Sequence, residues 1–192
     1  MPFNYKTTFS TPFFEIEEGI NSNDLGAEPY YRVTGVDSVI CCVMTLSGEF
    51  VMIKQYRPNI DEVTLELPAG GLLDNEKPVD AAKREFAEET SLTCDFIFLG
   101  DYRLMMNRTN IKEYIYFGMN PQAGDDTIQE SNIEVHLIDR KKLAKLSFTG
   151  FYKQLAGLGV IQLASSYLEL NILSDPIEEI YSKFKLRQNY EC

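Results

Sequence analysis

Two short runs of sequence determine what this chain folds into. They read Gly70-Gly71-Leu72-Leu73-Asp74-Asn75-Glu76 and, seven residues later, Arg84-Glu85-Phe86-Ala87-Glu88-Glu89-Thr90-Ser91-Leu92. Pro78, between the two runs, suits the first position of a helix. Apolar residues then recur at helical spacing as far as Ala87, which marks one buried face. The sequence therefore predicts a helix from Pro78 to Thr90 that follows a glycine-rich loop.

Three acidic residues of this helix lie at positions that share one face. Glu85, Glu88 and Glu89 have the i, i+3, i+4 spacing, so their like charges repel one another unless a cation neutralises them. Hard divalent cations prefer carboxylate oxygens, and the backbone of a glycine-rich loop can approach a phosphate closely. A charged run of this kind is often only a solvated helix face. The alternative is a joint metal and phosphate site, in which the metal acidifies a water and neutralises phosphoryl charge.

The spacing of both runs resembles the Nudix box, G-x5-E-x7-R-E-U-x-E-E-x-G-U, where U is a bulky apolar residue. The matching residues are Gly70, Glu76, Arg84, Glu85, Phe86, Glu88, Glu89 and Leu92. Ser91 stands where the box has its last glycine. That position follows a helix end, where a left-handed backbone is common, and there serine would cost roughly 1 kcal/mol relative to glycine.

The resemblance implies a fold, which the order of the elements supports. Nudix proteins are α/β/α sandwiches, and here strands, one helix, further strands and further helices follow in turn, as in an α/β protein with a mixed β core. We expect residues 1–35 to form an N-terminal arm or small β subdomain, and residues 36–192 to form the Nudix hydrolase domain. The predicted strands are 36–45, 50–56, 63–67, 96–102, 113–117 and 134–138; the predicted helices are 78–90, 141–146, 151–170 and one that starts at Asp175-Pro176. Residues 68–71 are predicted to be a loop.

The resemblance also implies roles for the matching residues. Nudix proteins use Mg²⁺ or Mn²⁺ to hydrolyse a nucleoside diphosphate linked to another moiety. By motif position the metal ligands would be Glu85, Glu88, Glu89 and the main-chain carbonyl of Ala69. Arg84 would orient the glutamates by ion pairing, whereas Gly70 and Glu76 would support the geometry of the loop and helix.

Residues before the box resemble one subgroup of this family. Lys54-Gln55-Tyr56-Arg57-Pro58 and Leu65-Glu66-Leu67-Pro68-Ala69-Gly70 look like the ADP-ribose and nucleotide-sugar pyrophosphatases. In that subgroup the arginine faces the substrate, and a planar guanidinium can grip a phosphate through two hydrogen bonds. The alternative for Arg57 is a surface ion pair at a strand end. Glu66 either reaches the site or pairs with a neighbouring base.

The stretch after the box leaves the substrate open. Many ADP-ribose enzymes carry a proline in the loop that corresponds to residues 102–110, and this chain has none there. Arg103 and Arg108 lie in it instead, as ligands for a phosphate or a sugar hydroxyl, or as ordinary exposed bases. ADP-ribose, an ADP-sugar and GDP-mannose all remain candidates.

A later acidic loop offers a general base. The family often takes a carboxylate from a loop well after the box, and residues 124–134 contain several acids. We select Glu130; Glu134 falls into the following strand pattern. A carboxylate base has to reach the attacking water by a hydrogen bond, which spacing alone does not establish. His136, the single histidine, is expected to be structural.

Composition excludes several classes of function. The 192 residues include 18 Lys and Arg against 29 Asp and Glu, for a net charge of −11. This charge opposes binding to nucleic-acid polymers or to anionic membranes, whereas a bound metal makes it compatible with a small diphosphate. The four cysteines show no C-x-x-C spacing, and no secretory signal pattern opens the chain, so we expect free thiols and a cytoplasmic protein.

The expected activity is Mg²⁺-dependent hydrolysis of the pyrophosphate bond in a nucleoside diphosphate sugar, with Mn²⁺ as a substitute cofactor. The products would be a nucleoside monophosphate and a sugar phosphate. The alternatives are hydrolysis of a dinucleotide such as NADH and a non-catalytic Nudix domain that senses nucleotides. A homodimer is expected by resemblance, with the apolar and aromatic residues of the N-terminal arm available for exchange between subunits.

Overall fold

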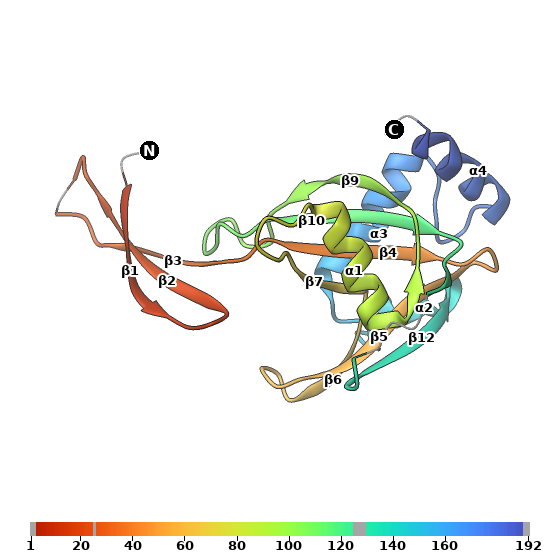
Figure 1. Ribbon diagram of the computed structural model, residues 1–192, viewed down its shortest axis with the longest axis horizontal. Coiled ribbons are helices and arrows are strands. Elements are labelled where there is room, and N and C mark those ends of the chain that lie inside the picture. Colours follow the sequence, from red (N-terminus) through yellow and green to blue (C-terminus); the bar gives the residue numbers. More distant parts are fainter. Residues whose placement is uncertain (1–2, 25, 125–129, 190–192) are drawn as a thin grey trace.

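The N-terminal residues form a small sheet that stands apart from the rest of the molecule. Figure 1 shows the computed structural model, which describes residues 3–24, 26–124 and 130–189. Strands β1 (Phe3–Ser10), β2 (Phe14–Asn21) and β3 (Tyr30–Gly35) pair antiparallel in that order. Strand β3 runs on into the main body, so one extended segment connects the two parts of the chain (Figure 1).

A mixed sheet forms the centre of the main body. Its strands are β4 (Ser38–Met44), β5 (Glu49–Arg57), β6 (Glu62–Glu66), β7 (Ala69–Gly71), β9 (Phe96–Tyr102), β10 (Glu113–Met119) and β12 (Ile133–Asp139). The strand order is β12-β5-β4-β10-β9, with β6 added to β5 and β7 added to β4. Strands β4 and β10 are parallel, whereas the other neighbouring pairs are antiparallel. Two short strands, β8 (Leu92–Thr93) and β11 (Gln122–Ala123), pair outside this sheet.

Helices cover both faces of the sheet. Helix α1 (Pro78–Thr90) lies on one face, and α3 (Leu155–Leu168) and α4 (Ile177–Gln188) pack on the other, where α2 (Arg140–Phe148) joins the same core (Figure 1). The expected α/β/α sandwich with a mixed β core is therefore confirmed. No helix among the described residues is both long enough and apolar enough to cross a membrane.

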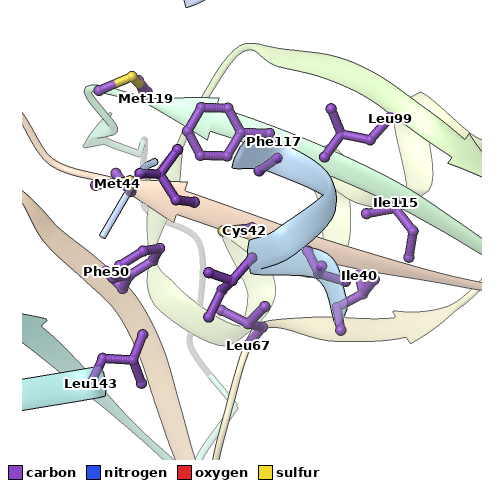
Figure 2. Packing of buried hydrophobic residues seen from close by; sticks show 14 of the residues in the cluster. Ile40, Cys42, Met44, Phe50, Leu67, Leu99, Ile115, Phe117, Met119 and Leu143 are labelled. Carbon is purple, nitrogen blue, oxygen red and sulfur yellow. The ribbon is translucent and has the colours of Figure 1, made fainter. Parts of the chain in front are cut away.

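Strand β4 has buried side chains on both of its faces, as is expected of a central strand between two helical layers. Ile40, Cys42 and Met44 belong to the core under α3 and α4, together with Phe117 of β10 (Figure 2). The residues between them on β4 belong to the second core, under α1. Because successive side chains of a strand point to opposite faces, one seven-residue strand supports both layers.

The structure corrects three details of the predicted elements. Residues 69–71, predicted as loop, form β7, because their main chain pairs with β4. Helix α3 begins at Leu155 and not at Phe151, because the amides of residues 151 and 152 still bond to Leu146 at the end of α2. Pro176, and not Asp175, is the N-cap of α4. The carboxylate of Asp175 instead accepts from the amide of Asn171 at 2.7 Å. The predicted bounds of α1 and β9 are confirmed.

Candidate active site

Packing of helix α1 on the sheet sets the positions of its carboxylates. Ala81, Ala82 and Phe86 are fully buried against the α1 side of the sheet, where Cys41 of β4 lies. The thiol of Cys41 donates to the carbonyl of Ala82 at 3.5 Å. With this face fixed, the acidic positions of the helix are directed toward the loop that precedes it, at residues 69–76.

Arg84 connects that loop to the helix. Its Nε and Nη2 donate to the two carboxylate oxygens of Glu76 at 2.8 Å, and Nη2 also donates to the carbonyl of Gly71 at 2.9 Å. Its Nη1 donates to Glu85 at 2.7 Å and to Glu88 at 2.9 Å. Mainly because of the hydrogen bonds from Arg84, the pKa of Glu76 is lowered to about 2. Arg84 is thus occupied in holding the loop and two helix carboxylates.

Glu89 is the most buried of the acidic residues on α1. It is 5% exposed, and its Oε2 accepts from the amide of Ala69 at 2.9 Å. Burial raises its pKa to about 8, against the effect of the Ala69 hydrogen bond, and the negative charges of Glu85 and Glu130 add to the rise. Burial also raises the pKa of Glu85. Ionised carboxylates at this place therefore need a compensating cation.

Gly70 leaves the space in which the Glu85 carboxylate lies. A Cβ atom added at Gly70 would fall 2.1 Å from the carboxyl carbon of Glu85. A side chain at this position would move that carboxylate away from the place it occupies, so Gly70 permits the close approach of Glu85 to the loop.

Glu130 lies next to the C-terminal part of helix α1. Its amide donates to the carbonyl of Glu88 at 3.0 Å, and its charge acts on both Glu85 and Glu89. Its side chain is exposed. Residues 125–129 of the acidic loop lie outside the described residues.

The donor atoms gathered here are those that a hard divalent cation prefers. Glu85, Glu88 and Glu89 offer carboxylate oxygens and Ala69 a carbonyl oxygen, so the group fits Mg²⁺ or Mn²⁺ in chemistry. In the part of the chain that the structure describes, no three acidic, thiol or imidazole groups are close enough to hold a metal as they stand. The carboxylates of Glu85 and Glu88 are both paired with Arg84.

Arg57 and Glu66 form a bidentate ion pair beside this cluster. The Nε of Arg57 donates to one oxygen of Glu66 at 2.7 Å, and its Nη2 donates to the other at 2.5 Å. Burial acts to raise the pKa of Glu66, but the hydrogen bonds from Arg57 and Thr64 outweigh it and the pKa lies below its usual value. The charge of Glu89 also acts on Arg57, which places the guanidinium within electrostatic reach of the helix.

Arg103 and Arg108 lie in a different place from the carboxylates. With Tyr5 and Tyr30 of the N-terminal sheet they line a cavity of about 210 Å³, to which Arg32, Met106, Thr109 and Asn110 also contribute. Neither arginine forms an ion pair with a carboxylate within residues 3–24, 26–124 and 130–189. The cavity shares no lining residue with the cluster on α1.

The structure thus brings together most of the residues that the sequence selected. Ala69, Gly70, Glu76, Arg84, Glu85, Glu88, Glu89 and Glu130 form one cluster, with the pair of Arg57 and Glu66 beside it. Sequence reasoning missed Thr64, whose hydroxyl donates to Glu66. Its position two residues before Glu66, on the same face of β6, was an available signal. It also missed Gln154, which belongs to no motif. Its side chain accepts from the amide of Leu67, 87 residues away in the sequence.

Comparison with known proteins gives a family, relatives that are similar in sequence and a solved structure that is similar in fold. A family model described as the NUDIX domain matches residues 35–153. An ADP-ribose pyrophosphatase from Bacillus subtilis (strain 168) is 38% identical over 56 residues, which are 29% of this chain and 30% of that protein. A methanol dehydrogenase activator from Bacillus methanolicus is 36% identical over 58 residues, which are 30% of this chain and 31% of that protein. The chain matches about a third of the length of these relatives.

A solved structure extends the similarity over most of the chain. It is described as "Crystal structure of ADP compounds hydrolase" and has a TM-score of 0.72 with this chain at 17% sequence identity. The match covers 86% of this chain and 92% of the other. At this identity the match establishes a shared fold.

Proposed function

Because this chain belongs to the NUDIX domain family, we propose that it is a hydrolase that cleaves the pyrophosphate bond of a nucleoside diphosphate sugar in the presence of Mg²⁺ or Mn²⁺. The observation that carries the proposal is the cluster on α1, where a buried glutamate and two further carboxylates meet a glycine-rich loop. A cluster that served only as a solvated helix face would have no reason to bury Glu89 to 5% exposure.

In the proposed mechanism the cation would be held by Glu85, Glu88, Glu89 and the carbonyl of Ala69. When bound, the cation supplies charge neutralisation at the phosphoryl oxygens and lowers the pKa of water. Arg84 donates to Glu85 and Glu88 and keeps their carboxylates in position, while its contact with Glu76 holds the loop to the helix.

The remaining residues act on water and on the substrate. Glu130, exposed beside the end of α1, takes the proton of the water that attacks phosphorus. The P–O–P bridge then breaks, the leaving phosphate takes up a proton, and a nucleoside monophosphate and a sugar phosphate result. Glu66 engages the Nε and Nη2 of Arg57, and we assign the Nη1 of Arg57 to a phosphate oxygen. Arg103 and Arg108 bind a more distant part of the substrate, since their cavity is separate from the cluster.

An adenosine diphosphate conjugate is the first choice of substrate. The support is that one relative is described as an ADP-ribose pyrophosphatase and the solved structure as an ADP compounds hydrolase. Arg103 and Arg108 each donate to a backbone carbonyl, but neither has a carboxylate partner among the described residues. Their positive charges and the two tyrosines of the 210 Å³ cavity suit an anionic or aromatic part of such a molecule.

A substrate panel tests the proposed function. ADP-ribose, ADP-glucose, GDP-mannose and NADH are each incubated with the protein and Mg²⁺, Mn²⁺ or EDTA, and products are identified by mass spectrometry in ¹⁸O-labelled water. The expected result is a nucleoside monophosphate and a sugar phosphate from ADP-ribose or ADP-glucose, with one ¹⁸O atom incorporated per cleavage and none in EDTA. Turnover of NADH alone would assign the protein to dinucleotides. Tight nucleotide binding without turnover in either metal would make it a nucleotide sensor and contradict the proposal.

A further inference from the structure

The main chain just before the glycine-rich loop is held from three directions. The amide of Leu67 donates to Oε1 of Gln154 at 2.9 Å. The carbonyl of Pro68 accepts from the amide of Cys41 at 2.8 Å, and the amide of Ala69 donates to Glu89 at 2.9 Å. Three consecutive residues are therefore attached in turn to the start of α3, to β4 and to α1. The first of these attachments has no counterpart among the motif residues.

Gln154 is the N-cap residue of α3, but its side chain does not cap that helix. It turns away instead and places its carbonyl oxygen against the amide of Leu67. The side chains that commonly cap a helix from this position are those of Ser, Thr, Asp and Asn, so a glutamine here contributes through its distant contact and not as a cap. The sequence separation of the contact is 87 residues.

Tyr152 and Gly157 fix the orientation of Gln154. The hydroxyl of Tyr152 donates to the same Oε1 atom at 3.2 Å, and the tyrosine side chain is 2% exposed. Burial raises the pKa of Tyr152, so the hydroxyl keeps its proton and remains a donor. A Cβ atom at Gly157 would lie 1.7 Å from the Tyr152 hydroxyl and 2.6 Å from Oε1 of Gln154. A glycine inside α3 is unfavourable compared with alanine, yet it is required for this arrangement.

We propose that Gln154 is a positioning residue for the carboxylate cluster, acting through the amide of Leu67 and oriented by Tyr152 and Gly157. The chain of contacts is short: Gln154 fixes Leu67, and Ala69, two residues further on, holds Glu89 and offers its own carbonyl to the cation. This inference rests on the proposed function, because the cluster is taken to bind a divalent metal.

In this proposal the functional atom of Gln154 is its acceptor oxygen Oε1, so two matched substitutions test it. Gln154→Met keeps the length and volume of the side chain but removes the acceptor. Gln154→Glu keeps an acceptor oxygen in the same place. Gln162→Met, on the exposed side of the same helix, serves as the control for loss of a glutamine amide.

Three measurements follow on the full-length protein. Hydrogen exchange at the amides of Leu67 and Ala69 reports the attachment itself, because Pro68 between them has no amide hydrogen. Mn²⁺ binding by electron paramagnetic resonance without substrate reports the cluster. Steady-state kinetics with ADP-ribose then separate kcat and the half-saturating Mg²⁺ concentration from the substrate KM. For Gln154→Met we expect faster exchange at the amides of Leu67 and Ala69, about tenfold weaker Mn²⁺ binding, a tenfold higher Mg²⁺ requirement and an unchanged substrate KM. Gln154→Glu and Gln162→Met should stay within about twofold of the parent protein in all of these.

A second variant tests the same arrangement from the other side. Gly157→Ala favours the helix by intrinsic propensity but displaces Tyr152 and Gln154, so it should reproduce the weaker Mn²⁺ binding without loss of the folded state by circular dichroism. Equal Mn²⁺ binding in Gln154→Met, Gly157→Ala and the parent would overturn the inference, as would equal impairment of Gln154→Met and Gln154→Glu. If the parent hydrolyses no conjugate, the proposed function fails, while exchange and Mn²⁺ binding still decide the role of Gln154.

Discussion

Ser91 illustrates how a single departure from a motif is tolerated. The expected left-handed backbone is confirmed, with φ of 58° and ψ of 22° after the last residue of α1. The amide of Ser91 still bonds to the carbonyl of Ala87, so the end of the helix is formed in the ordinary way. The cost of serine lies in the backbone conformation and not in a lost contact.

Ser91→Gly should therefore stabilise the protein by about 1 kcal/mol, because glycine adopts positive φ without steric penalty. The free energy of unfolding from urea titration measures the change. Ser166→Gly is the control, since that serine lies inside α3, where glycine is unfavourable and should cost about 0.5–1 kcal/mol. A destabilised Ser91→Gly protein would show that the serine side chain contributes more than its backbone costs.

Glu89 joins the loop to the helix, and its replacement tests the metal site directly. Glu89→Gln keeps an acceptor for the Ala69 amide but cannot supply the ionised carboxylate that a cation would bind. We expect a loss of Mg²⁺-dependent hydrolysis on the order of 10²-fold or more, with the fold retained. Unchanged hydrolysis at saturating Mg²⁺ would show that Glu89 is not a ligand.

Arg57 is held by Glu66 in a two-point contact that lysine cannot reproduce. Arg57→Lys should raise the substrate KM on the order of tenfold with a smaller effect on kcat, because a point charge replaces the planar guanidinium. Steady-state kinetics on the best substrate of the panel provide the measurement. A lower kcat with an unchanged KM would instead assign Arg57 to the reaction step.

At the scale of elements, the strands and helices with strong periodicity were predictable and the unusual ones were not. The bounds of α1 follow from Pro78 and the apolar spacing after it, and the bounds of β9 were also predicted. Strand β7 was missed because Ala69–Gly71 has no side-chain pattern, and its pairing with β4 is purely a main-chain interaction. The start of α3 was misplaced because Tyr152, apolar enough to read as helix, is buried in a turn that completes α2.

Strand β10 carries a half-buried carboxylate, which gives a pH-dependent prediction. Glu113 lies on the same face as Ile115 and Phe117, and burial raises its pKa above the ordinary value. The folded state therefore holds this proton more tightly than the unfolded state, and that stability is present at low pH and lost as the pH rises through the folded pKa. Glu113→Gln should match the parent near pH 4 and be the more stable protein at pH 7.

Thermal unfolding between pH 4 and pH 8 measures this difference for both proteins. Glu28→Gln, at an exposed position in the connection between β2 and β3, is the control. Its difference in thermal stability from the parent should not grow as the pH rises. A constant difference between Glu113→Gln and the parent across the range would contradict the prediction.

At the scale of the whole molecule, residues close in sequence made a predictable cluster and distant ones did not. The box residues span little more than one loop and one helix, so their spacing alone indicated a common site. The contact of Gln154 with Leu67 depends on how α3 returns to the sheet, which no local pattern encodes. Arg103 and Arg108 line one cavity, which also includes Tyr5 and Tyr30 of the N-terminal sheet. No local pattern in the sequence indicated that these tyrosines lie near the two arginines.

The N-terminal sheet leaves large apolar side chains in solvent. Phe9 of β1 is 54% exposed, and Phe13, in the turn between β1 and β2, is 83% exposed. No helix of the described structure covers this sheet. We predict that these side chains are buried in a homodimer, seen as twice the chain mass of 21.9 kDa in light scattering. Phe13→Asp should shift the equilibrium to monomer without unfolding the protein, whereas Leu186→Asp on α4 should not. A monomeric parent protein at micromolar concentration would exclude the dimer.

The buried pair Cys41 and Cys42 gives this protein an internal reporter of its own opening. Their thiols lie on opposite faces of β4, both fully buried, and burial raises the pKa of each. A thiol-modifying reagent can reach them only when the central strand separates from one helical layer or the other. In the Cys42→Ala variant the rate of modification of Cys41 would report separation of α1 from the sheet, and in the Cys41→Ala variant the rate at Cys42 would report separation of α3 and α4. A faster rate at Cys41 would show that α1 detaches before the rest of the molecule unfolds.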